Sequence, residues 1–202
     1  SDIGYNGILD LITGNWNGFH RIYTHANNTF VDTASINFRQ PSKIRTIISA
    51  DFDNDGFDEI FLNNIGQPNK LFRVLDNNKL EQLELTNALE KTGLGTGGAV
   101  ADLNGDGILE LLIAHGESAP EPLSLFSANV KDDFQYLRIE PRNSYDAPAS
   151  GATVTLKTNF RSHAKTIDAG SGYLCQMEPV AHFGIRKNEK IEYVQIKWTD
   201  GQ

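Results

Sequence analysis

The stretch Asp51-Phe-Asp-Asn-Asp-Gly56-Phe-Asp-Glu59 carries carboxylates at its first, third, fifth and ninth positions and a glycine at its sixth. Alternate spacing lets these oxygens converge on one point, while the glycine allows the sharp turn behind them. An all-oxygen cage with several carboxylates suits Ca²⁺ better than Mg²⁺ or a transition metal. The predicted ligands are Asp51, Asp53, Asp55, the main-chain carbonyl of Phe57, and Glu59.

This window occurs three times along the chain. Its central glycines, Gly7, Gly56 and Gly107, are 49 and 51 residues apart. A period of about 50 residues with strand-like flanks is the size of a propeller blade, which holds four short strands. The repeat therefore predicts an all-β fold, a partial β-propeller followed by a small C-terminal β-domain.

The other two windows differ in how well they match. Residues 102–110 supply a second predicted calcium set, and residues 2–10 a weaker one, because Gly4 replaces the second ligand there. The alternative for the weaker window is a turn maintained by Asn6-Gly7. The second set is Asp102, Asn104, Asp106, the carbonyl of Ile108, and Glu110, and the weaker set is Asp2, Asn6 and Asp10.

Short β-branched or apolar runs predict the strands, and Asn and Gly clusters predict the turns between them. We expect blades over residues 1–131, divided into a partial blade 1–44 and blades 45–94 and 95–131, and a β-domain over 132–202. The expected strands are 45–50, 59–62, 70–74, 80–84, 111–113, 123–126, 134–140, 152–156, 164–167 and 191–198.

The loops fit an EF-hand or a simple Asx-turn poorly. An EF-hand needs flanking helices and a glutamate at position 12, whereas Leu62 and Ile113 stand there inside expected strands. Simple Asx-turns would leave three carboxylates crowded into five residues of the window at Asp51 without a neutralising cation. We therefore expect calcium to close each cage at position 9, on the outgoing strand of a hairpin.

The composition limits the classes of partner and site. The net charge of −8 and the lack of a basic patch disfavour nucleic acid, and no apolar run reaches the length of a membrane helix. The single cysteine excludes an internal disulfide. A nucleophilic pair of Cys175 and His182 is weighed and disfavoured, because a small buried thiol explains Cys175 better. The chain starts without Met and stops after a turn signal, so we expect a fragment of a longer protein.

Two segments resemble known repeat and domain signatures. The stretch from Asp51 to Gly56 resembles the FG-GAP/VCBS-type propeller repeat. The segment Asp168-Ala-Gly-Ser-Gly-Tyr173-Leu-Cys-Gln-Met-Glu-Pro-Val-Ala-His-Phe-Gly184 resembles the ASPIC/UnbV signature, although Ala169 and Ile185-Arg186 depart from it. Together with Gly14-Asn-Trp-Asn-Gly18 and Gly95-Thr-Gly-Gly98, they resemble the cartilage acidic protein family.

This resemblance implies a propeller of about seven blades, an ASPIC/UnbV-like domain over 132–202, and no enzyme activity. It also implies secretion or an extracellular place, or a periplasmic or cell-surface one if the source is bacterial. We expect a calcium-binding interaction or scaffold module whose partner is an extracellular protein or glycan. The missing blades are expected from the same parent chain. Alternatives are a propeller hydrolase or lyase acting on extracellular polysaccharide, and a helical calcium sensor.

Overall fold

The computed structural model describes residues 1–75, 79–117, 119–130 and 135–201. Across these ranges the chain forms strands and one short 3-10 turn, η2 (Asn87–Leu89), and no α-helix. In the same ranges no helix has the length and apolarity needed to span a membrane. The all-β prediction is confirmed.

The centre of the N-terminal part is a four-stranded antiparallel sheet in the order β4-β5-β6-β7. Strand β5 is buried along its whole length, since both of its faces are covered by neighbouring sheets. This explains its unbroken apolar run at 60–62. Its strands are β4 (Ile44–Ala50), β5 (Glu59–Asn64), β6 (Lys70–Leu75) and β7 (Lys79–Leu83).

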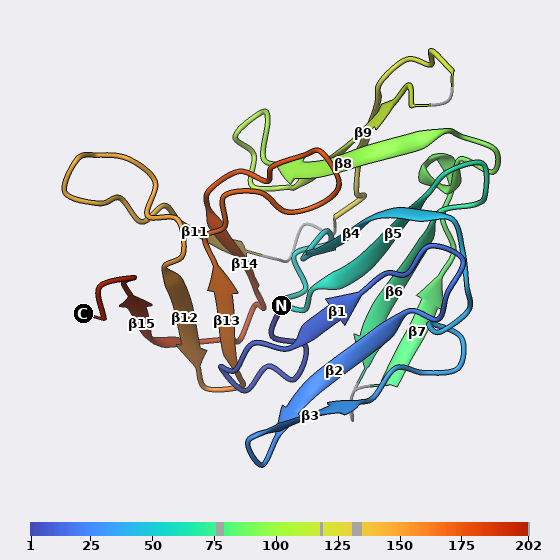
Figure 1. Cartoon of the computed structure of the whole chain (residues 1–202). Coiled ribbons are helices and arrows are strands. Elements are labelled where there is room, and N and C mark those ends of the chain that lie inside the picture. Colours follow the sequence, from blue (N-terminus) through green and yellow to red (C-terminus); the bar gives the residue numbers. More distant parts are fainter. Residues whose placement is uncertain (76–78, 118, 131–134, 202) are drawn as a thin grey trace.

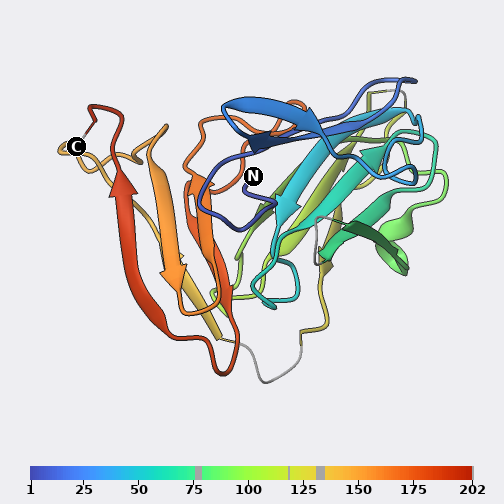
Figure 2. The same ribbon diagram turned by 90° about the horizontal axis from the view of Figure 1, so that it is seen from below.

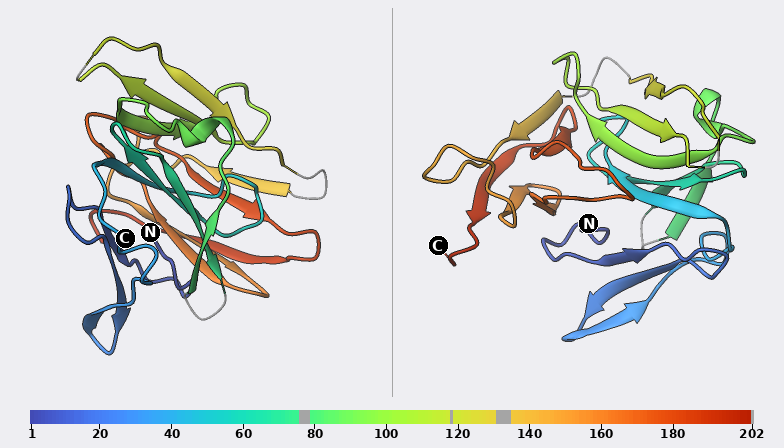
Figure 3. Two further views of the ribbon diagram at one scale, coloured as in Figure 1. Left: turned by 90° about the vertical axis from the view of Figure 1, so that its right-hand side faces the viewer. Right: turned by 45° about the horizontal axis from the view of Figure 1, so that its top comes forward.

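A three-stranded sheet packs on each face of this central sheet, so that the three sheets fan out like adjacent propeller blades (Figure 3, right). Ile22 and Phe72 share the core on one side, and Ile48, Phe61 and Ile113 share the core on the other. One outer sheet is β1 (Leu11–Thr13), β2 (Arg21–Ala26) and β3 (Thr29–Asp32), and the other is β8 (Gly95–Ala101), β9 (Glu110–His115) and β10 (Ser124–Ser127).

The last third folds into two small sheets, β11-β14 and β13-β12-β15, which bury one apolar cluster between them. We call this unit the C-terminal sandwich. It stands beside the N-terminal sheets (Figures 1 and 2). Leu156 and Phe183, one from each sheet, are completely buried in its core. Its strands are β11 (Gln135–Ile139), β12 (Thr153–Thr158), β13 (Ser162–Thr166), β14 (Ala181–Ile185) and β15 (Ile191–Lys197).

Most expected strands are present, with ends shifted by one or two residues, and the expected start at residue 134 lies outside the described residues. Five strands were missed: β1 to β3 in the first repeat, β8 in the third, and β14 in the C-terminal sandwich. Only the central sheet shows all four strands of a blade among the described residues. The loops at 51–59 and 102–110 are flanked by strands, and their twelfth positions, Leu62 and Ile113, lie inside β5 and β9. Because an EF-hand needs flanking helices, neither loop is one.

Candidate metal centre

The three repeated windows share one backbone conformation. Their sixth residues are glycines with φ of 85°, 90° and 83°. Their fourth residues, Tyr5, Asn54 and Gly105, also adopt left-handed φ values of 49°, 56° and 78°. Glycine and asparagine enter this region at low cost, whereas a tyrosine there is uncommon. The three loops are therefore the same backbone turn with different side chains.

In the central loop, the structure brings together Asp51, Asp53 and Glu59. One carboxylate oxygen from each lies within 4.8 Å of the others, which is the spacing of ligands around a single ion. Asp51 is held from behind, because its Oδ2 accepts the main-chain N–H of Gly56 over 2.9 Å. Phe52 N–H likewise donates to Glu59 Oε2 over 3.1 Å.

One further oxygen each of Asp51 and Glu59 has no hydrogen-bond donor among the described residues. Asp51 Oδ1 and Glu59 Oε1 are buried without a hydrogen bond in the described part of the chain. Burial, with the charges of the neighbouring carboxylates, raises the pKa of Glu59 from 4.5 to about 10. Burial also raises the pKa of Asp51 to about 7, although Lys165 opposes this. A buried carboxylate pair that lacks hydrogen bonds is costly unless protons or a cation neutralise it, and the donor set fits Ca²⁺.

Two further groups modify this cluster. Asp55 is outside the group of three, and its Oδ1 accepts the N–H of Phe57 over 2.9 Å. Its pKa is raised, first by burial and then by the charge of Asp53. Arg73 on β6 approaches the cluster from the other side, with its Nη2 atom 3.2 Å from Asp53 and its Nε atom 4.0 Å from Glu59 Oε1. This guanidinium offsets part of the negative charge.

The loop at 102–110 is more open, and its side chains satisfy one another. Asn104, Gly105 and Asp106 are exposed. Asn104 Nδ2 donates to Asp106 Oδ2 over 2.9 Å and to Glu110 Oε1 over 3.4 Å, so an amide nitrogen occupies the place that a cation would take. The amide must turn before these carboxylates can share an ion. The carbonyl of Ile108 remains a predicted ligand here, as that of Phe57 does in the central loop.

The loop at 2–10 uses its carboxylates to hold its own backbone. Both oxygens of Asp2 accept main-chain N–H groups, from Asn6 over 3.2 Å and from Gly7 over 2.8 Å. Asp10 accepts three more, among them that of Ile3 over 2.9 Å. Asn6 Oδ1 accepts the N–H of Ile8. Because backbone donors occupy these oxygens, the geometry favours the turn that was the alternative for this window.

The C-terminal sandwich covers the central loop. Gly184 N–H donates to Asp51 Oδ2 over 2.9 Å, and His182 Nε2 lies 2.7 Å from Asn54 Oδ1. Arg186 Nε donates to the Asp55 carbonyl over 2.8 Å, and its guanidinium lies 4.1 Å from the centre of the Phe57 ring. A side chain at position 184 would meet Asp51 and the Asn54 backbone, so only glycine fits there.

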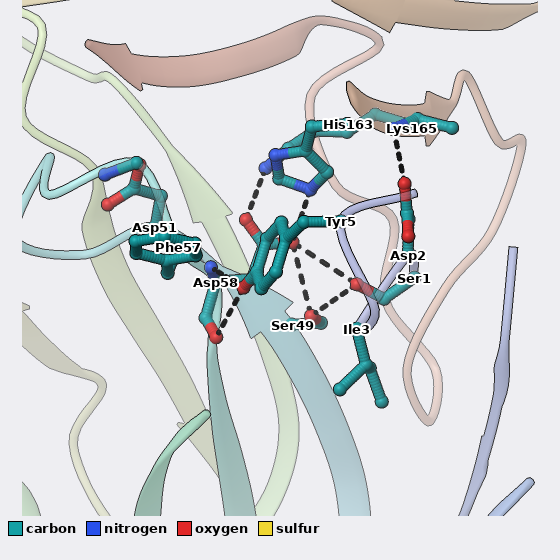
Figure 4. Close-up of polar contacts among 12 residues, drawn as sticks. Ser1, Asp2, Ile3, Tyr5, Ser49, Asp51, Phe57, Asp58, His163 and Lys165 are labelled. Atoms are coloured by element: carbon teal, nitrogen blue, oxygen red, sulfur yellow. Dashed lines mark hydrogen bonds and ion pairs between the residues drawn. The ribbon is translucent and has the colours of Figure 1, made fainter. Parts of the chain in front are cut away.

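Asp58, at position 8 of the central loop, carries a second polar network that sequence reasoning missed (Figure 4). Lys165 Nζ lies 2.6 Å from its Oδ1, and His163 Nε2 lies 3.8 Å from its Oδ2. Burial raises the pKa of Asp58, but Lys165 and His163 outweigh it and hold that pKa far below its usual value. Tyr5 Oη accepts the Asp58 N–H over 2.6 Å. In the sequence, Asp58 is marked only as an acidic residue directly before the apolar strand β5, which does not predict its polar partners.

The fourth residues of the first two loops reach the next loop or the sandwich. Tyr5, from the first loop, contacts Asp58 and packs edge-on against Phe57. Asn54, from the central loop, donates through Nδ2 to the carbonyl of Gly107 over 2.8 Å, besides binding His182. Neither residue was among the predicted site residues, because a ligand-spacing pattern treats position 4 as a spacer.

A cavity of about 520 Å³ lies between the strands β1 and β4 and the C-terminal sandwich. Asp58, Lys165 and His182 reach its wall, but the described wall does not include the clustered carboxylates of the central loop. A metal held by that cluster would therefore lie outside this cavity, with Asp51 and Glu59 buried beside it. A catalytic metal instead keeps an open coordination position that faces its substrate.

The disfavoured nucleophilic pair finds no support in the structure. His182 faces Asn54, and burial, with the charges of Lys165 and Arg138, lowers its pKa from 6.5 to about 3. Cys175 lies against β8, where a side chain on Gly97 would meet its sulfur. Burial raises the pKa of this thiol, which is the opposite of the shift that activates a cysteine.

Comparisons with known proteins agree with this architecture. The profile described as FG-GAP-like repeat matches residues 2–62 and 51–113, and the one described as ASPIC and UnbV matches 142–202. Cartilage acidic protein 1 from Homo sapiens is 46% identical over 215 residues, which include all of this chain and 32% of that protein. The proteins of the same name from Mus musculus and Xenopus tropicalis are 45% and 44% identical, with 33% of each covered.

The chain spans about a third of the length of these curated relatives. Their shared name states no enzymatic activity. The repeat profile covers the three loops and the sheets they connect, and the second profile covers most of the C-terminal sandwich. The chain therefore belongs to the FG-GAP-like repeat proteins that also carry an ASPIC and UnbV segment, the family of the cartilage acidic proteins.

Proposed function

We propose that this chain is a calcium-stabilised part of an extracellular interaction module that binds a protein or a glycan. The observation that carries the calcium assignment is the pair of buried carboxylate oxygens without a hydrogen bond among the described residues, Asp51 Oδ1 and Glu59 Oε1. A bound Ca²⁺ would neutralise these groups and hold the hairpin together. The loop at 102–110 is the second and weaker site, and the loop at 2–10 works as a turn without metal.

The role of the ion is structural. Extracellular modules bind calcium with dissociation constants of roughly 10⁻⁴ to 10⁻³ M. At about 1 mM free calcium, each such site adds on the order of 0.4–1.4 kcal/mol to the free energy of unfolding by mass action. The enclosed position of the cluster, away from the cavity wall, argues against a polysaccharide hydrolase or lyase that uses this ion.

The N-terminal sheets are proposed to be blades of a larger ring. Leu11, Tyr23 and Phe30 lie on the face of the first sheet that points away from the core, and Leu11 and Phe30 are 50% and 57% exposed. Leu125, 56% exposed, lies on the outer face of the β8–β10 sheet. Further blades from the same parent chain would cover both faces, and the proposed division from the C-terminal domain falls near residue 131.

Calcium binding and partner binding are tested separately. Isothermal titration should show calcium binding, and chelation with EGTA should lower the melting temperature. An unchanged melting temperature together with no heat of binding would remove the calcium assignment.

A glycan array and a pull-down from extracellular matrix extract, with the calcium-loaded chain as bait, test whether the partner is a glycan or a protein. Turnover of a polysaccharide that is lost in Asp51→Ala without loss of folding would instead favour the enzyme.

A further inference from the structure

The central loop has two sides with different neighbours. Its inner side presents the clustered oxygens of Asp51, Asp53 and Glu59. Its outer side is covered by the C-terminal sandwich, through strands β13 and β14 and the residues that follow them. Asp51 belongs to both sides, because its Oδ2 accepts the Gly184 N–H while its buried Oδ1 has no partner in the described chain.

The contacts on the outer side depend on the conformation of the loop. Asn54 presents its Oδ1 atom to His182 from a left-handed backbone position, with φ of 56°. The Asp55 carbonyl, which accepts from Arg186, also belongs to this turn. Without a cation, the carboxylates on the inner side must repel one another or take up protons, and either cost destabilises this conformation of the turn. A shared cation removes that cost.

We propose that calcium in the central loop latches the C-terminal sandwich onto the N-terminal sheets, so that binding of the ion and docking of the sandwich strengthen each other. This inference rests on the proposed calcium site and adds its regulation. The ion fixes the turn that presents Asn54 and the Asp55 carbonyl. In return, the sandwich holds Asp51 in the position that the ion requires. Such coupling is reciprocal by thermodynamic necessity.

The loop at 102–110 lacks this arrangement. Its fourth residue is Gly105, which has open space around its α-carbon, and its third to fifth residues are exposed. Its contacts with the sandwich come from Asp102, whose Oδ2 lies 3.6 Å from Arg138 Nε and whose N–H donates to Glu178, and from Gly107, which packs against the ring of Tyr136. The exposed turn at 104–106 makes no polar contact with the sandwich among the described residues, so calcium in this loop is expected to change docking less than calcium in the central loop.

Hydrogen exchange followed by mass spectrometry tests the latch in the 202-residue chain. On chelation with EGTA, the amides of Gly184 and Ala164 should exchange at least tenfold faster and should raise the exchange of peptides 181–186 and 162–166. Gly184 donates to Asp51 in the central loop and is released directly, whereas Ala164 donates to Asp2 in the first loop and is released when the sandwich undocks. Amides of β12, which bond within the sandwich, should keep their protection and report that it stays folded. Equal loss of protection in β12 would mean general unfolding and would overturn the latch.

Two matched variants assign the effect to one loop. Glu59→Gln and Glu110→Gln each remove the carboxylate at position 9, and the Glu59 side chain makes its polar contacts with Phe52 and Arg73 in the N-terminal sheets. In Glu59→Gln the calcium-dependent change in exchange at 181–186 should disappear. In Glu110→Gln it should persist. The opposite pattern, or loss in both, would overturn the assignment to the central loop.

Reciprocity gives a test from the other side of the interface. Arg186→Ala removes the bond to Asp55 and the contact with Phe57 without touching the carboxylate cluster. This variant should raise the dissociation constant for calcium at one site by about 3- to 10-fold. Arg142→Ala is the control and should leave calcium binding unchanged, because Arg142 is exposed and, among the described residues, pairs only within the C-terminal sandwich. Calcium binding unchanged in Arg186→Ala would overturn the latch and leave the calcium site intact. No calcium binding by the wild type would remove both proposals.

Discussion

The main-chain N–H of Gly184 donates to Asp51 Oδ2 over 2.9 Å, across a separation of 133 residues. The same oxygen accepts the N–H of Gly56 from within the loop. One carboxylate therefore ties the turn of a hairpin to a strand of the C-terminal sandwich. The first aspartate of the 2–10 loop repeats this relationship, because Asp2 Oδ2 accepts from Gly7 and from Ala164.

Gly184→Ala should lower the free energy of unfolding by about 2–4 kcal/mol, because the added methyl group collides with Asp51 and the Asn54 carbonyl and breaks a buried hydrogen bond. Urea unfolding in saturating calcium measures this loss. Gly170→Ala is the matched control, since a side chain at 170 meets nothing within 4 Å. Equal stability of the two variants would contradict the close contact between Gly184 and Asp51.

Glu59→Gln should raise the free energy of unfolding in EGTA by on the order of 2 kcal/mol and should remove the increment that calcium adds. Without a cation, the folded state must protonate Glu59, whose pKa is raised to about 10, and an amide avoids this cost. Thermal melts with EGTA and with calcium give both quantities. Glu192→Gln, on the exposed strand β15, should change neither. A Glu59→Gln chain that keeps the full calcium increment would contradict the ligand assignment.

His182 should make the protein sensitive to acid. Its folded pKa is about 3 against 6.5 for the free side chain, so its stabilisation is present above pH 6.5 and is lost as the pH falls towards 3. Between pH 7 and pH 5 the wild type should lose about 2 kcal/mol more than His182→Gln, which cannot titrate and keeps a donor for Asn54. Urea unfolding of both chains at the two pH values is the measurement. Parallel pH dependence would mean that His182 is accessible to protons in the folded state.

Asn104→Asp should tighten calcium binding at the 102–110 loop by about tenfold, because a carboxylate replaces the amide nitrogen that now faces Asp106 and Glu110. In EGTA the same variant should be less stable than the wild type, since the added charge has no partner. Asn6→Asp is the control and should create no new site, because backbone donors already occupy both oxygens of Asp2. Isothermal titration of the three chains distinguishes these outcomes.

Local patterns in the sequence were sufficient to predict an all-β fold and the four strands of the central sheet. The repeated glycines and the buried run at 60–62 located the hairpins and β5, because strand pairing across a short turn depends on residues close in sequence. Strands β1 to β3 are partly exposed and have no run of apolar residues to mark them. Strand β8 has three glycines among its seven residues, and glycine is depleted in strands. Strand β14 is buried at all five residues, with His182 and Gly184 between its apolar ones, so it shows neither alternation nor an unbroken apolar run.

The site was predictable only on its inner side. The spacing of Asp51, Asp53 and Glu59 led to the group that the structure assembles, while Asp55 turned out to cap the Phe57 N–H. The outer side could not be predicted, since Asn54 and Asp58 acquire their roles from His182 and Lys165, more than 100 residues away. Contacts over such separations leave no periodic signal.

The fourth residues of the loops have a consequence for any larger ring of such repeats. Tyr5 bonds to the loop that follows its own, and so does Asn54. The loops thus form a linear array in which each loop is stabilised by contacts with its nearest neighbour. Where successive loops both bind calcium, such contacts are expected to make loading cooperative, and a defect in one repeat should affect most the repeats on either side of it.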